Sequence, residues 1–123
     1  MGSCMQAEII TVSSFVWNPF LITGPGFAEA LVAHLYGTSV AELHATTRGG
    51  ERIAFARQLA MYLLHIVYKM DRGEVAGRFG RDRSTVSHAC RRLEDMREDP
   101  ALDRLVRRLE ILLREAGRIG LRP

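Results

Sequence analysis

The chain has 123 residues, 47% of them hydrophobic, with 17 basic and 14 acidic side chains and a net charge of +3. This length allows one domain whose core needs no disulfide or metal, and the composition excludes a disordered chain. Cys4 and Cys90 lie far apart and have no zinc-ligand spacing, so we expect no metal site and free thiols in a reducing cytoplasm. Few prolines and long stretches without glycine favour an all-α fold of five to six helices.

Residues 1–26 are predicted to form an N-terminal arm that is irregular or packed on the domain. Glu8, Asn18 and Pro19 interrupt its apolar residues and no basic segment precedes them, which argues against a signal peptide and a membrane span. The arm's aromatic residues either pack on the domain or contact a protein partner or a second copy in a homodimer.

The predicted domain, residues 27–117, begins with three helical segments. The first covers residues 27–36, with helical spacing of Phe27, Ala30, Leu31, His34 and Leu35. The second covers residues 39–45; Ser39 caps it, and it buries Val40 and Leu43. A polar loop over 46–52 follows. The third, residues 53–70, is apolar enough to be the spine of the domain, with buried candidates Ile53, Ala56, Ala60, Leu63, Leu64 and Val67.

Residues 71–93 have the pattern of a helix-turn-helix, with two short helices around a corner at Gly80 and Arg81. Asp71 and Glu74 have the spacing of a capping box, and Asp82 can cap the second helix. A 100° step per residue places on one face Val86, Ala89, Cys90, Leu93 and Met96, and on the other Ser84, Ser87, His88 and Arg91. A solvent-exposed face of hydroxyls and arginines can enter a major groove of DNA. The alternative interpretation is an ordinary helical hairpin whose arginine face is solvated.

Asp99 and Pro100 start a last helix that runs to about Ala116 and ends at Gly117, leaving residues 118–123 as a tail. Its predicted inner face consists of Leu102, Leu105, Val106, Leu109 and Leu112.

The charges are distributed unevenly along the chain. The net charge is −3 over residues 1–47, +6 over residues 48–92 and zero over residues 93–123. Because the positive segment contains the helix-turn-helix, a nucleic acid is the expected partner.

Residues 27–116 resemble the C-terminal DNA-binding domain, domain IV, of the bacterial replication initiator DnaA. The matching stretches are residues 32–43, 56–64 and 74–94. The most specific is Arg-Asp-Arg-Ser-Thr-Val-Ser-His-Ala at residues 81–89, where the family has Arg-Asp-His-Thr-Thr-Val-x-His-Ala. The resemblance implies a Trp-repressor-like helical domain that binds double-stranded DNA, with this helix in the major groove and a basic loop in the minor groove.

Carried over residue by residue, the resemblance implies base readers Asp82, Arg83, Ser84 and Thr85. It implies a minor-groove loop with Arg48 and Arg52. It also implies the phosphate-binding residues Arg57, Gln58, His65, Arg81, His88 and Arg91. Alternatives remain: Arg57 and Gln58 form a solvated helix flank, Arg52 neutralises Glu51, His65 is structural, and His88 supports its helix.

Two departures from the family pattern affect specificity. Arg83 replaces the family's His, and one glycine before the Arg-Asp pair is absent. Arginine donates two hydrogen bonds to guanine O6 and N7, so we expect a shifted recognition sequence with a guanine opposite Arg83. The basic loop is also longer than in the family and contains acidic Glu51.

The sequence has no G-x-x-x-x-G-K-[ST] run, so no nucleotide cofactor is expected. An enzyme is not expected either, because His88 and Cys90 are two residues apart on a helix and point to different faces. The favoured function is a nucleoid-associated, cytoplasmic regulator of replication initiation or transcription. The alternative is a protein-interaction module that has lost most of its DNA affinity.

Overall fold

The computed structural model describes residues 24–120, and within them every regular element is a helix. The helices are α3 (Pro25–Leu35), α4 (Val40–Leu43), α5 (Glu51–Ile66), α6 (Arg72–Phe79), α7 (Arg83–Met96) and α8 (Pro100–Gly120). The all-α prediction is confirmed. The predicted N-terminal arm, apart from its last residues, and positions 121–123 of the tail lie outside the described residues. Among the described helices none combines the length and apolarity needed to cross a membrane.

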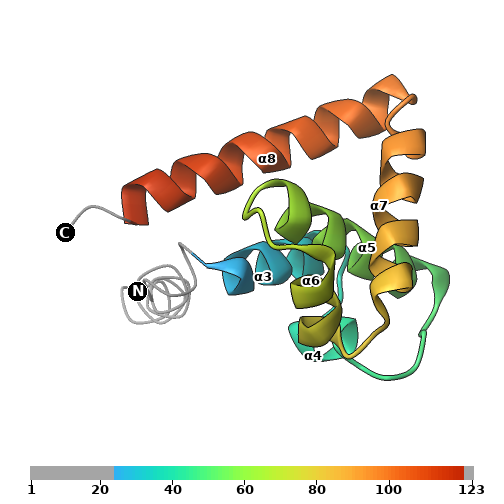
Figure 1. The fold of residues 1–123 in the computed structure, drawn as a ribbon. Helices are drawn as coiled ribbons and strands as arrows, with labels where there is room; N and C mark the ends of the chain where they lie inside the picture. The colour runs from blue at the N-terminus through green and yellow to red at the C-terminus, as the bar shows by residue number, and fades with distance from the viewer. Residues whose placement is uncertain (1–23, 121–123) are drawn as a thin grey trace, which may run out of the picture.

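Helix α5 is the spine of the domain, as predicted. It contacts α3, α4, α6 and α7, and α8 runs back over these helices from the far end of α7 (Figure 1). Leu59, Leu63 and Leu64 of α5 are completely buried against Val86 and Leu93 of α7 and the rest of one continuous core. This core fixes α7 by its apolar face and leaves the opposite face of α7 to solvent.

Local sequence signals start and end α6, the first helix of the helix-turn-helix, at the predicted positions. Asp71 and Glu74 form the predicted capping box, with both reciprocal bonds at 2.9 Å. Gly80 ends α6 with a φ of 64°, a left-handed conformation that glycine adopts without strain. The amide of Arg81 donates to the Ala76 carbonyl at 3.0 Å, which closes the corner before α7.

The buried face of α3 differs from the prediction. Its buried residues are Ala28, Glu29, Val32 and Ala33. Leu35, one of the residues at helical spacing, is 48% exposed. The apolar pattern could not include Glu29, whose carboxylate is paired inside the protein.

Smaller corrections concern helix registers and ends. Val40 is exposed because α4 is a single turn whose only buried residue is Leu43. Leu112 is 47% exposed, since the buried row of α8 runs through Leu113 instead, and α8 continues through Gly117. The spine helix α5 runs from Glu51 to Ile66, so it begins two residues earlier and ends four residues earlier than the predicted 53–70.

Candidate nucleic-acid interface

The first residues of α7 point outward. Asp82 holds the N-cap position with an extended backbone, but its side chain makes no capping hydrogen bond, contrary to the prediction. Asp82, Arg83, Ser84 and Thr85 are exposed. Among the described residues, none of these four side chains has a hydrogen-bond or ion-pair partner. Their polar groups are therefore available to a ligand.

The same outward face continues along α7. His88 and Arg91 are exposed, and within the described part of the chain neither side chain is bonded. The opposite face buries Val86, Ala89, Cys90 and Leu93, as predicted. Burial raises the pKa of the Cys90 thiol, which favours its neutral form. We refer to Asp82–Thr85, His88 and Arg91 as the reading face.

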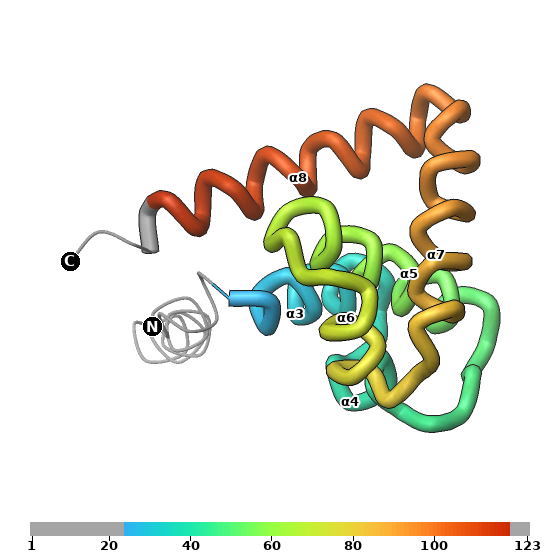
Figure 2. Tube along the Cα trace, viewed as in Figure 1, coloured from blue at the N-terminus to red at the C-terminus, as the bar shows by residue number. Residues whose placement is uncertain are grey.

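The loop of residues 44–50, between α4 and α5, passes beside the start of α7 (Figures 1 and 2). We call it the α4–α5 loop. Arg81, in the corner before α7, joins the two: its Nη2 donates to the Thr47 carbonyl at 3.4 Å and its Nη1 to the Phe79 carbonyl at 3.0 Å. A helix start and a loop thus form one continuous edge.

Arg57, predicted to bind a phosphate, lies inside the protein and is not on a solvated helix flank. The residue is 5% exposed. Its guanidinium donates to the carbonyl oxygens of Leu43 (2.6 Å), Glu42 (3.0 Å), Arg48 (3.0 Å) and Thr47 (3.3 Å). Burial lowers the pKa of Arg57, and the nearby charges of Arg81 and Arg48 lower it further. These three cations make the edge strongly positive.

Arg52 is also bonded within the protein. Its Nη1 donates to the carbonyls of Tyr36 and Gly37, the latter at 2.8 Å, and so satisfies the C-terminal end of α3. Arg48, not Arg52, pairs with Glu51, at 3.5 Å. Arg48 is 60% exposed, and an exposed pair of this kind contributes little, so Arg48 can exchange Glu51 for a phosphate.

Two further predicted phosphate contacts lie on α5. Gln58 is half-buried. His65 is half-buried as well, and its Nδ1 donates to the Met70 carbonyl at 2.8 Å, which holds the turn after α5. This is the structural alternative that the sequence left open for His65.

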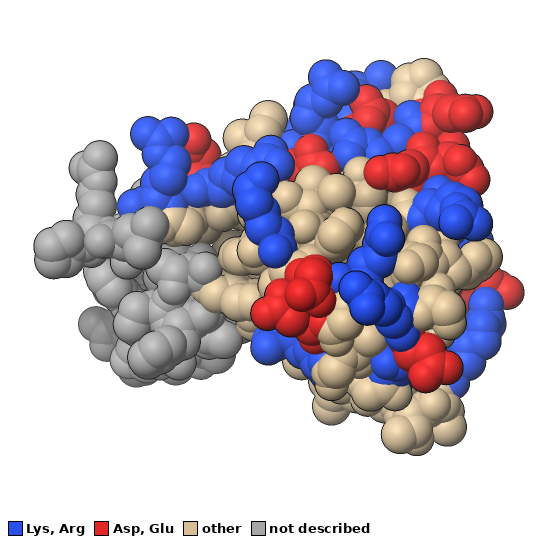
Figure 3. Space-filling model, viewed as in Figure 1, with Lys and Arg blue, Asp and Glu red and all other residues tan. Residues whose placement is uncertain are grey.

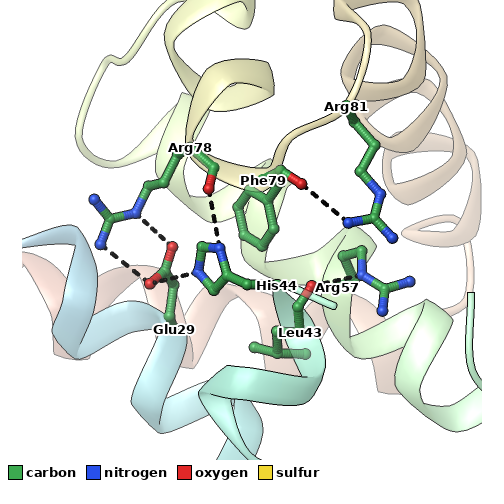
Figure 4. A network of polar contacts seen from close by, with 7 residues as sticks. All are labelled: Glu29, Leu43, His44, Arg57, Arg78, Phe79 and Arg81. Carbon is green, nitrogen blue, oxygen red and sulfur yellow. Dashed lines mark hydrogen bonds and ion pairs between the residues drawn. The ribbon is translucent and has the colours of Figure 1, made fainter. Parts of the chain in front are cut away.

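A buried ionic network behind the edge was missed by sequence reasoning (Figure 4). Glu29 on α3 is 1% exposed and accepts two hydrogen bonds from Arg78 on α6, at 2.5 and 3.1 Å. His44 Nε2 lies 3.1 Å from the same carboxylate. The hydrogen bonds that Arg78 donates to Glu29 raise the pKa of Arg78. The available signal was that Glu29 is the one acidic residue in the otherwise apolar α3 segment.

The face drawn in Figure 3 carries many basic side chains, with separate acidic groups among them and the largest acidic group at the upper right, where α7 meets α8. That corner holds Glu94, Asp95, Glu98 and Asp99. It lies at the opposite end of α7 from Asp82–Thr85, so the acidic corner is far from the start of α7 and from the α4–α5 loop.

Comparison with known proteins gives one consistent match. The family described as bacterial dnaA protein helix-turn-helix matches residues 29–93. The chain is 37% identical over 87 residues to the chromosomal replication initiator protein DnaA of Mesorhizobium japonicum, and 36% over 88 residues to that of Laribacter hongkongensis. Each alignment covers 70% of this chain, but only 17% and 18% of those relatives. A DnaA of Lachnoclostridium phytofermentans is 32% identical over 78 residues, covering 62% of this chain and 17% of that relative.

Proposed function

The chain belongs to the bacterial DnaA helix-turn-helix family, and from this premise we propose that it binds double-stranded DNA sequence-specifically. The observation that carries the proposal is the reading face, whose polar side chains are exposed and unbonded within the described residues. A bare row of donors and acceptors at the start of a helix is what contacts with base edges require.

Each group on the reading face has a chemical use in the major groove. Arg83 can donate two hydrogen bonds to a guanine, and the free carboxylate of Asp82 can accept from a cytosine N4 amino group. Ser84 and Thr85 are short enough to let the helix approach the bases. His88 and Arg91, further along the helix, are proposed to contact phosphates.

The α4–α5 loop is proposed to enter the adjacent minor groove with Arg48. Its guanidinium is exposed and held only by the weak surface pair with Glu51. Arg81 sits between loop and helix, where its positive charge attracts the intervening phosphates. Arg57 is left out of the contact set because its Nε, Nη1 and Nη2 serve backbone carbonyls, and Arg52 because its Nη1 is held at the end of α3.

In the cell, the proposed role is to occupy sites related to those of DnaA and so regulate replication initiation or transcription. The names of the relatives concern initiation of chromosomal replication. This chain spans under a fifth of the length of those relatives. The proposed role is therefore limited to binding such sites in the cytoplasm.

Equilibrium binding at several salt concentrations tests the proposal. A duplex enriched by the chain from a random-sequence pool is labelled, and its dissociation constant is measured by fluorescence anisotropy. We expect steep loss of affinity with salt, with a log-log slope of about −0.9 for each phosphate neutralised. Failure to enrich any duplex, or a flat salt response, overturns the proposal and favours a protein-interaction module.

A further inference from the structure

We propose that Arg57 and Arg81 are positioning residues that hold the α4–α5 loop at a fixed offset from α7, so that loop and helix read DNA as one unit. The inference rests on the proposed DNA binding and assigns these two arginines a role in specificity without requiring either to touch a base.

One backbone oxygen lies at the centre of this arrangement. The Thr47 carbonyl accepts from Arg57 Nη2 at 3.3 Å and from Arg81 Nη2 at 3.4 Å. Arg57 comes from α5 and Arg81 from the corner that starts α7, so the shared acceptor ties the loop to both elements. Arg57 also binds the carbonyl of Arg48 itself at 3.0 Å, which fixes the backbone of the proposed minor-groove reader.

The beginning of the loop is attached to the helix-turn-helix independently (Figure 4). The His44 ring stacks on Phe79, with centroids 4.4 Å apart and planes 3° from parallel. Its Nδ1 donates to the Arg78 carbonyl at 3.0 Å. Arg78 and Phe79 form the last turn of α6, directly before the Gly80 corner. The loop is thus fastened to the reading unit at residue 44 and again at residue 47.

The loop needs such external support because its own sequence does not hold it. Gly49 has a φ of 75° and is followed by Gly50, and glycine has the largest backbone freedom of any residue. Holding a flexible reader in its bound conformation before binding lowers the entropy that association must remove. The carbonyl bonds of the buried Arg57 and the half-buried Arg81 supply that preorganisation.

A double-mutant cycle distinguishes positioning from direct contact. Arg48→Ala is measured in the wild-type background and in Arg57→Met and Arg81→Met, using the labelled duplex that the wild-type chain selects from a random-sequence pool. We expect Arg48→Ala to weaken binding about tenfold in the wild type and less than about twofold in either variant, because an unheld Arg48 contributes little. Equal factors in all three backgrounds overturn the inference, since the effects of independent contacts add.

Matched measurements keep the test interpretable. Arg83→Ala, on α7, is expected to cost the same factor in every background, because the core holds α7; a loss of this effect too overturns the inference in favour of general damage. Far-UV circular dichroism reports folding, and Arg81→Met, whose side chain is only half-buried, decides the matter where Arg57→Met does not fold. If no duplex is selected, the proposed function falls with the inference. If a duplex is selected but Arg48→Ala has no effect in the wild type, only the inference falls.

Discussion

The reading face on α7 and the region around the α4–α5 loop both contain arginines, but they differ in whether those side chains are hydrogen-bonded within the protein. Arg83, Ser84 and Thr85 have no side-chain partner within the described residues, whereas Arg52 and Arg57 are bonded to backbone carbonyls. A guanidinium whose donors nearly all satisfy carbonyls, as in Arg57, has little left to offer a phosphate. The difference separates groups that can recognise DNA from groups that give the recognising elements their shape.

The largest expected effect comes from breaking the network behind the edge. Glu29→Gln leaves Arg78 and His44 without their buried carboxylate and is expected to lower the free energy of unfolding by about 3 kcal/mol. Urea denaturation followed by circular dichroism measures it. Glu94→Gln is the control, since that exposed carboxylate has no hydrogen-bond or ion-pair partner in the described chain, and its effect is expected within about 0.5 kcal/mol. Equal stabilities of the two variants would contradict the assigned role of Glu29.

Arg83→Ala removes one of the unbonded side chains of the reading face. We expect affinity for the selected duplex to fall by about 1 to 3 kcal/mol, with the urea midpoint unchanged. Arg104→Ala on α8, also exposed and unbonded within residues 24–120, is the matched charge control and is expected to change affinity less than twofold, within about 0.4 kcal/mol. An Arg83→Ala variant that binds as tightly as Arg104→Ala argues against base reading by α7.

The salt dependence of DNA affinity also distinguishes an unbonded arginine from one bonded to backbone carbonyls. Arg91→Ala is expected to reduce the log-log salt slope by about 0.9, as removal of one phosphate contact does. Arg52→Ala is expected to leave the slope unchanged and to lower stability by about 1 kcal/mol, because Arg52 serves the end of α3. Anisotropy titrations at four salt concentrations provide both slopes. A reduced slope in Arg52→Ala would place Arg52 on the DNA.

The smallest expected effect is on the pH dependence of stability, and it comes from the corner between α7 and α8, away from the reading face and the α4–α5 loop. Hydrogen bonding from Arg97 lowers the pKa of Asp103 below its ordinary value of 3.8. Stability from this pair is therefore present above that value and is lost as pH falls through the lowered pKa. Wild type is expected to exceed Asp103→Asn in urea midpoint at pH 6, and the two are expected to converge in strong acid. A constant difference across this range contradicts the assignment.

Sequence reasoning located the helix-turn-helix well, because its signals are local. The Asp71 and Glu74 box, the glycine corner and the apolar stripe of α7 each depend on residues a few positions apart. The same reasoning could not assign Arg52, Arg57 or His65, since their partners are backbone carbonyls whose positions depend on the fold. Arg57 and Arg83 are both arginines in a basic segment, and only packing tells them apart.

The apolar pattern did not identify the buried face of α3 for a related reason. Glu29 is compatible with burial only because Arg78 lies 49 positions later and reaches it at 2.5 Å. Hydrophobic periodicity carries no information about such long-range pairs. The register of α8 failed more simply: adjacent Leu112 and Leu113 are chemically alike, so their sequence does not say which one faces the core.

Parallel selection from one random-sequence pool, with the wild-type chain and with Arg83→Ala, tests the central claim most directly. The claim is that the reading face of α7 contacts base edges. It predicts that wild type enriches one consensus containing a guanine and that Arg83→Ala loses preference at that position while keeping the rest. The same consensus from both proteins, or enrichment by neither, would contradict it.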